Sequence, residues 1–207
     1  KTGTAGAFFP AIVIFWPFLN FSMMLTNLFG IDSGGLRGMI LLPVERHKYI
    51  LAKNLALAPF VVGSCVPFLL FGLAMEMFTL RTLIIALLGS TQIYVVYCMF
   101  GNFMSLFFPF RIHRDNMRAN TRSVMMIFVG LLTSFSLGVL AIPIAMLFLL
   151  DSYVSMEYGA QWPAGIVGAA VFLLATLGVY RLILPHLGDI LLAREQKILE
   201  AVIRDRE

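Results

Sequence analysis

The chain has 207 residues, of which 60% are hydrophobic and only 13% are charged. A soluble domain carries about 25% charged residues, and a folded surface needs more polar cover than this composition supplies. The sequence therefore predicts an integral membrane protein and excludes an ordinary soluble domain. The net charge of +4 does not indicate a nucleic-acid partner, because the positive charges lie in short loops between apolar runs.

Five charge-free runs follow one another along the chain and predict five membrane-spanning helices. About 20 residues, at roughly 1.5 Å each, cross the hydrocarbon core of a bilayer. The runs do not alternate as the strands of a membrane barrel would. They comprise residues 8–29, 55–75, 82–110, 123–150 and 158–180. The predicted fold is an all-α polytopic helix bundle that forms one transmembrane domain over residues 1–207.

Lysine and arginine residues gather on one side of this predicted bundle. Of the 15 in the chain, all but Lys1 and Arg81 lie in the loop 30–54, in the loop 111–122 or after residue 180. The positive-inside rule then places both basic loops and the tail, residues 186–207, in the cytoplasm. With five spans the N-terminus falls outside, and we expect the chain to be the C-terminal part of a longer protein. The tail predicts a helix that lies on the membrane face.

Polar but no ionisable side chains occur within the five runs. An ion-coupled carrier keeps charged groups at membrane depth, so that class is disfavoured. The polar side chains either form hydrogen bonds between helices, which is the favoured interpretation for each of them, or line a pathway for an amphipathic cargo. They are Asn20, Ser22, Gln92, Asn102, Thr133 and Ser134. Cys65 and Cys98 lie in apolar runs and are expected to be packing residues.

The chain carries none of the common motifs of nucleotide binding or hydrolysis. It has no glycine-rich phosphate loop, no Gly-x-Ser-x-Gly and no His-Glu-x-x-His. Its three histidines, His47, His113 and His186, are far apart in the sequence and do not predict a metal centre. We therefore expect no cofactor and no catalytic residue in this chain.

The stretch DSGGLRGMILLPVERHKYILAKN, residues 32–54, interrupts the apolar chain with glycines, a proline and a cluster of charges. Asp32 or Ser33 is suited to cap a short helix. Gly34 and Gly35 permit a sharp turn out of the membrane. The pattern predicts that a new helix begins here, on the face of the bilayer.

The predicted short helix is amphipathic. Its apolar face is formed by Leu36, Met39 and Ile40. Arg37 lies on another face, and Pro43 ends the helix. Residues 45–48 then form a polar turn, and the chain re-enters the membrane after Lys53. A helix of this kind either rests on lipid or grips a cytosolic partner.

The residues FGIDSGGLRGMILLPVERHKYILAKNLALAP resemble the first cytoplasmic loop of exporter-type ABC transporter permeases. The resemblance rests on Leu-Leu-Pro-Val-Glu-Arg at 41–46 and on Ile-Leu-Ala-Lys-Asn at 50–54. Ala52 occupies a position where that family usually has glycine. The family usually has two acidic residues before the short helix, and this chain has only Asp32 there. A second segment, FGNFMSLFFPFRIHRDNM at 100–117, is similar to the end of a span in a bacterial subset of these permeases. On this resemblance the family's first span is not in the chain.

The resemblance implies a type II ABC permease of the bacterial inner membrane that forms the pathway of an exporter. ATP and magnesium would be bound by a separate ATPase subunit, docked on residues 32–43. A second permease copy, in a homodimer or a heterodimer, would complete the pathway within membrane lipid. Residues with an implied partner-coupling role are Asp32, Leu36, Arg37, Met39, Ile40, Pro43, Glu45, Arg46 and Lys53. Of these, Glu45, Arg46 and Lys53 would fix the loop against the membrane face or the partner.

Two other functions stay open on the sequence. The loop RIHRDNMRANTR, residues 111–122, would suit an embedded enzyme that holds the phosphate of a lipid between its arginines, beside His113 and Asp115. However, the positive-inside rule by itself accounts for the arginines of a cytoplasmic loop, and no nucleophile–base pair is evident. The second alternative is a non-catalytic membrane scaffold that binds partners without ATP.

Overall fold

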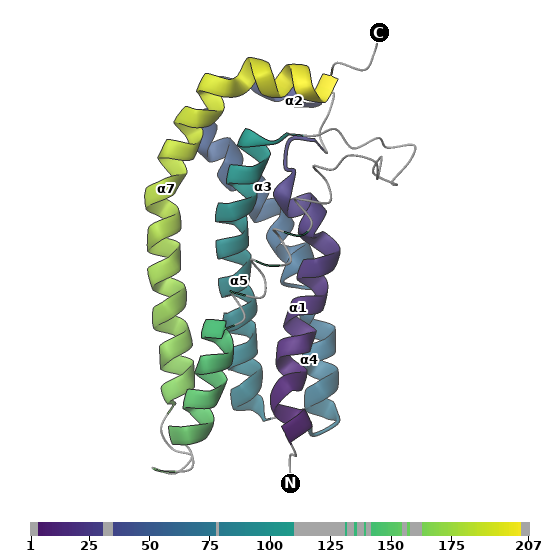
Figure 1. The fold of residues 1–207 in the computed structure, drawn as a ribbon, viewed down its shortest axis with the longest axis vertical. Helices are drawn as coiled ribbons and strands as arrows, with labels where there is room; N and C mark the ends of the chain where they lie inside the picture. Colours follow the sequence, from purple (N-terminus) through teal and green to yellow (C-terminus); the bar gives the residue numbers. More distant parts are fainter. Residues whose placement is uncertain are drawn as a thin grey trace.

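The computed structural model describes residues 4–30, 35–77, 79–109, 131, 135, 139, 142–154, 157 and 163–203, and this part of the chain is helical (Figure 1). The labelled helices are α1 (Thr4–Thr26), α2 (Gly35–Ile40), α3 (Arg46–Val61), α4 (Cys65–Ala74), α5 (Leu80–Phe107) and α7 (Ala164–Ile203). A further apolar helix comprises Ile142–Val154. The all-α fold class is confirmed for the described residues. Most of the predicted span 123–150 lies outside them.

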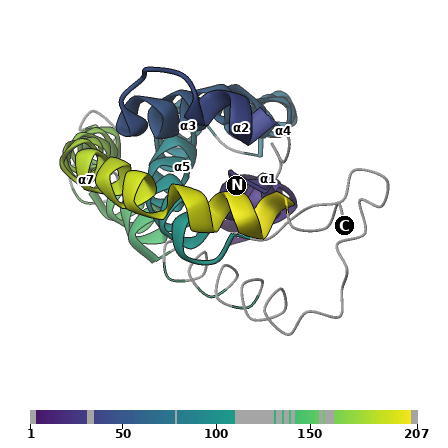
Figure 2. The same cartoon turned by 90° about the horizontal axis from the view of Figure 1, so that it is seen from above.

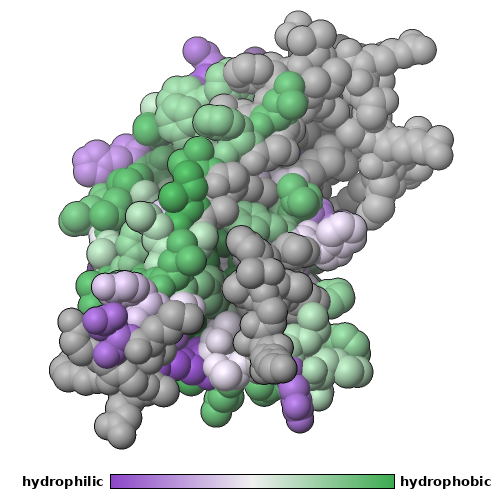
Figure 3. Space-filling view, turned by 60° about the horizontal axis from the view of Figure 1, so that its bottom comes forward, coloured by the Kyte–Doolittle hydropathy of each residue, from purple (hydrophilic) through white to green (hydrophobic). Residues whose placement is uncertain are grey.

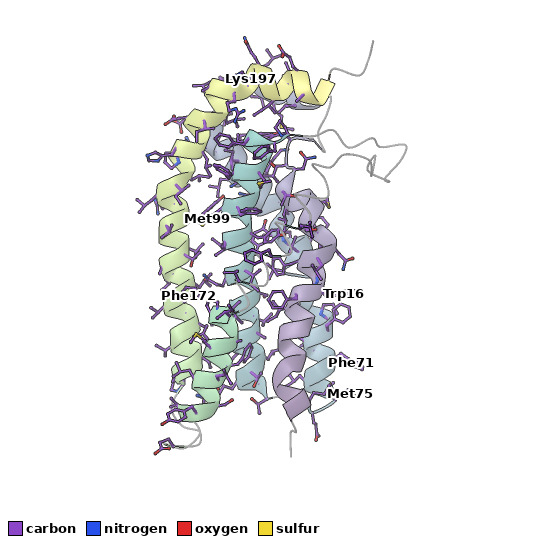
Figure 4. All side chains as sticks on the ribbon, in the orientation of Figure 1. Trp16, Phe71, Met75, Met99, Phe172 and Lys197 are labelled. Carbon is purple, nitrogen blue, oxygen red and sulfur yellow. The ribbon has the colours of Figure 1, made fainter. Side chains whose placement is uncertain are left out.

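Three helical segments within the described residues are long and apolar enough to cross a membrane. They are Arg46–Ala74, which joins α3 and α4, Leu80–Phe107 and Ala164–Ala201. Hydrophobic residues cover much of the visible flank of the bundle, and hydrophilic residues gather toward its ends (Figure 3). Trp16 and Phe71 point outward from this flank (Figure 4). The protein is therefore membrane-embedded.

Helix α5 forms the centre of the bundle and packs against α7, α1 and α4. Phe18 of α1 lies against Tyr97 of α5, with ring centroids 6.1 Å apart. A side chain in place of Gly101 would overlap the carbonyl of Leu25, so glycine allows α1 and α5 to approach closely. Nearby, the Leu28 N–H donates to Ser105 Oγ at 2.7 Å. These contacts fix the end of α1 against α5.

The second predicted span, 55–75, consists of two helices rather than one. Pro67 has no N–H to donate to the carbonyl of Gly63, and the N–H of Val66 donates to that carbonyl instead, at 3.1 Å. Pro59 similarly removes one hydrogen bond inside α3. The bond missing at Pro67 coincides with the break between α3, which ends at Val61, and α4, which begins at Cys65.

The end of the bundle opposite α2 is closed by a turn and an ion pair. Glu76 follows α4 with a positive φ of 56°, and the Met77 N–H donates to the carbonyl of Gly72 at 3.0 Å, as in a Schellman cap. Arg81, in the first turn of α5, donates to Asp151 Oδ1 at 2.9 Å and 2.5 Å. The same oxygen accepts from the N–H of Gly165 in α7 at 3.0 Å. Arg81 belongs to α5 and Asp151 to the helix Ile142–Val154, so this contact joins two helices whose predicted spans, 82–110 and 123–150, exclude both residues.

Helix α7 is a single helix of 40 residues, Ala164–Ile203. The sequence predicted a span at 158–180 followed by a separate tail helix; the structure joins the two through Pro185, and residues 158–162 lie outside the described part. The last turns of α7 cross the end of the bundle above α5 and α1, with α2 beside them (Figures 1 and 2). This crossing determines which residues of the α2 loop stay accessible.

Candidate functional site

The candidate site is the loop that carries α2, at the end of the bundle where the last turns of α7 cross. Leu36 is only 2% exposed, and the small crevice beside it is lined by Met39 and Ile40 of α2 and by Leu191 and Ile198 of α7. The apolar face predicted for the short helix therefore exists, but it packs against α7 within the chain. Asp32 lies outside the described residues, as does the side chain of Arg37.

The accessible part of this loop is the α2–α3 turn, which we define as residues 41–45. Leu41 is 84% exposed, Leu42 54% and Val44 45%, and Pro43 and Glu45 are also exposed. Helix α2 ends at Ile40, earlier than Pro43, because the chain reverses through bonds from Leu42 N–H to Met39 O at 3.2 Å and from Val44 N–H to Leu42 O at 2.8 Å. Three large apolar side chains are thus presented next to one another.

Arg46 holds this turn in place from the start of α3. Its guanidinium donates to the carbonyl of Ile40 at 2.9 Å and to the carbonyls of Leu42 and Val44 at 3.4 Å each. Its Nε also forms an ion pair with Glu195 of α7, and both side chains are largely buried, at 17% and 16% exposed. One arginine therefore fixes the shape of the turn and attaches the turn to α7.

Charged residues beside Arg46 form the first turn of α3, where the sequence predicted a polar turn outside any helix. Glu45 precedes the helix, and its carboxylate lies 3.0 Å from Lys48 Nζ and 3.4 Å from His47 Nε2. The hydrogen bond and positive charge of Lys48 lower the pKa of the Glu45 carboxyl. A carboxylate at a helix N-terminus is also favoured by the helix dipole, which explains why α3 begins here.

Lys53 attaches α3 to the end of α1. Its Nζ donates to the carbonyl of Leu28 at 2.5 Å and lies 5.4 Å from the ring centroid of Phe29 and 5.3 Å from that of Tyr49. The two rings stack with centroids 6.2 Å apart. The ammonium group therefore satisfies a carbonyl in the turn after α1 and makes two cation–π contacts. The loop is fixed on both sides, to α1 through Lys53 and to α7 through Arg46.

A glycine in α7 permits this arrangement. A Cβ atom at Gly188 would lie 2.7 Å from the backbone nitrogen of His47 and 3.1 Å from its Cα. Such distances to backbone atoms are too short for any side chain. The first turn of α3 and α7 thus touch through backbone, as in other close helix contacts that need small residues.

The polar residues proposed for a pathway are not brought together. The side chains of Asn20 and Ser22 bond back to carbonyls of α1, at 2.8 Å each. Gln92 donates to Thr176 of α7 at 2.5 Å. Asn102 is buried and accepts from Asn54 at 3.2 Å. Thr133 and Ser134 lie outside the described residues. Each of these contacts is a hydrogen bond within one helix or between two helices. The sequence favoured that interpretation over a pathway lining.

A buried polar cluster of α3, α5 and α7 was not predicted. Asn54 Nδ2 donates to the hydroxyl of Tyr180 at 2.7 Å, and the hydroxyl of Tyr94 donates to the backbone carbonyl of Asn54. Asn102 completes the cluster through its bond with Asn54. Polar residues at positions 54, 94, 102 and 180 show no common motif, so only the fold reveals that they meet.

Within the described residues, no group of three histidine, cysteine, aspartate or glutamate residues is placed to hold a metal ion. Cys65 and Cys98 are buried and form no disulfide with each other. No family model, curated protein or solved structure matches the chain.

Proposed function

We propose that the chain is the membrane-spanning permease subunit of an ATP-driven exporter of the ABC type, and that the α2–α3 turn docks a separate ATPase subunit. The observation that carries the proposal is the exposed apolar set Leu41, Leu42 and Val44, held in one shape by Arg46 at the basic end of the bundle. A plain connector between two spans does not need a fixed apolar surface.

The arrangement of anchors supports a role in transmitting movement. The turn is joined through Arg46 and Glu195 to α7, and α3 is joined through Lys53 to the end of α1. A displacement of the turn by a bound ATPase would therefore pull on α1, α3 and α7 together. This is the mechanical connection that a permease without its own nucleotide site requires.

The full proposal keeps five spans, with the α2 end in the cytoplasm of a bacterial inner membrane. Helix α1 has 23 residues with no charge, which at about 1.5 Å per residue suffices to cross the hydrocarbon core. The described helix Ile142–Val154 would be the last part of the span predicted at 123–150. The basic residues of the α2 loop and of the last part of α7 lie at this end, as the positive-inside rule expects of a cytoplasmic side, and the loop 111–122 lies outside the described residues. A second permease copy would complete the pathway, and ATP and magnesium would bind only to the ATPase.

The test is co-purification of the full chain with the ATPase encoded nearest to it, using a tag on the membrane subunit. Leu41→Asp and Leu42→Asp should each lower ATPase recovery about tenfold or more, because each replaces an exposed leucine that the docked ATPase would bury. Leu192→Asp changes an exposed leucine of α7 outside the turn and serves as the matched control. Charge reversal by Arg37→Glu and Glu45→Lys tests the surrounding charges.

The outcomes separate the candidate functions. Loss of ATPase recovery with Leu41→Asp and Leu42→Asp, but not with Leu192→Asp, supports docking at the turn. Equal recovery in all variants would place the contact elsewhere and contradict the proposed site. A well-folded membrane subunit that binds no ATPase would contradict the permease assignment and favour an embedded enzyme or a scaffold.

A further inference from the structure

A pocket of about 680 Å³ lies between α3, α5 and α7, apart from the α2–α3 turn. Its volume is that of a site for a small organic molecule. Helix α3 contributes residues from His47 to Ala58, and α7 contributes residues from Leu177 to Pro185. Three segments distant in the sequence thus form one concave surface on the flank of the bundle.

The chemistry of the pocket changes along its length. His47 lies at the α2 end, where the Glu45 carboxylate is 3.4 Å from its Nε2. Arg181 directly follows Tyr180 in α7, and no ion-pair partner of Arg181 is found among the described residues. The polar cluster follows, with Asn54, Tyr94 and Tyr180 in the wall. The remaining lining is mostly apolar, and it includes Leu55, Ala58, Val95 and Leu177. An arginine therefore adjoins the polar wall, and apolar side chains line most of the rest of the pocket.

The length of the pocket matches one leaflet of a membrane. From His47 to Ala58, α3 rises by roughly 16 Å at 1.5 Å per residue. Half of a hydrocarbon core of about 30 Å is nearly the same distance. Leu55 and Leu177 at the apolar end are exposed on the flank of a membrane-embedded bundle. The pocket is therefore open to lipid.

We propose that this pocket binds one anionic phospholipid from the leaflet on the α2 side. Arg181 faces the phosphate, the adjoining polar wall contacts the glycerol and ester groups, and an acyl chain extends along Leu55, Ala58 and Leu177. A free phosphate ion would contact Arg181 but would leave the apolar part of the pocket empty. The lipid site does not depend on an ATPase, so it holds whether or not the proposed function is correct.

The test is a titration of delipidated, detergent-purified full chain with phosphatidylglycerol or with phosphatidylcholine of the same acyl chains, read by native mass spectrometry. We expect one phosphatidylglycerol to be retained in preference to phosphatidylcholine. Arg181→Gln should weaken phosphatidylglycerol binding about five- to tenfold, because it removes a charge-assisted contact to phosphate. Lys197→Gln removes the same charge from the exposed end of α7 (Figure 4) and should change nothing.

A second pair of variants tests the apolar part of the pocket. Leu177→Trp should fill the pocket and abolish selective retention, whereas Leu182→Trp, on an exposed face of the same helix, should not. Inorganic phosphate should not compete with the lipid at equal concentration. Equal binding of both lipids in all variants, displacement by inorganic phosphate alone, or occupation of the pocket by a second copy of the chain with no lipid retained would overturn the proposal.

Discussion

Arg46 of α3 and Glu195 of α7 form an ion pair across the end of the bundle, although they are 149 positions apart in the sequence. The same guanidinium holds the α2–α3 turn through three backbone carbonyls. One side chain therefore joins the turn to the last part of α7.

Replacing Arg46 by glutamine should loosen both elements at once. We expect a loss of about 1–3 kcal/mol, since a largely buried charge loses its partner and several carbonyls lose a donor. Hydrogen exchange should become faster in residues 35–45 and in 190–201 together. Lys48→Gln is the control, because its pair with Glu45 is exposed and worth little. Faster exchange in only one of the two segments would show that Arg46 does not connect them.

Gly188→Ala should displace α7 from α3. The added methyl group meets the backbone of His47, which cannot move aside as a side chain would, so we expect a cost of about 1–3 kcal/mol. Gly178→Ala adds the same methyl to the same helix with nothing within 4 Å and should stabilise by about 0.5–1 kcal/mol. Thermal unfolding in detergent would measure both. Similar shifts for the two variants would contradict the close approach.

Glu76→Gly should stabilise the protein by about 1 kcal/mol. Glu76 has a left-handed backbone conformation that costs a residue with a Cβ and costs glycine nothing. Glu76→Ala keeps the strain and removes only the charge, so its melting temperature should stay near that of the native chain. An equal gain for both variants would attribute the effect to charge instead of backbone conformation.

The ion pair of Arg81 and Asp151 should be strongly coupled. A double-mutant cycle with Arg81→Gln and Asp151→Asn should give a coupling free energy of about 1–3 kcal/mol, because both side chains are largely buried. Asparagine keeps an acceptor for the Gly165 N–H, so the cycle isolates the charge interaction. Additive losses in the two single variants would mean that each residue acts separately.

Apolar runs were enough to predict two of the helices closely. The runs 8–29 and 82–110 correspond to α1 and α5 with ends shifted by a few residues. Helix starts were less predictable. Residues 46–48 are charged and suit a polar turn equally well, but the carboxylate of Glu45 and the dipole of α3 allow the helix to begin there. The break after Val61 depends on which N–H bonds to the Gly63 carbonyl in place of the one that Pro67 lacks, and that is a property of the folded chain.

The contacts of the α2 loop were only partly predictable. An amphipathic pattern gives Leu36, Met39 and Ile40 a common face but does not say whether lipid, a partner or the same chain covers it. The covering residues, Leu191 and Ile198, belong to a tail whose pattern suits the membrane face just as well. The hydrogen bond between Asn54 and Tyr180 likewise cannot be predicted from the periodicity of the sequence, because it joins helices distant in the chain.

The position of α7 over α2 has a consequence for how the protein is made. Synthesis proceeds from the N-terminus, so Leu36 leaves the ribosome long before Leu191 and Ile198 exist to cover it. Until translation ends, the apolar face of α2 is available to chaperones and proteases. A chain that stops early, before Leu191, would keep that face uncovered permanently, and quality control would have a direct way to distinguish incomplete chains from finished ones.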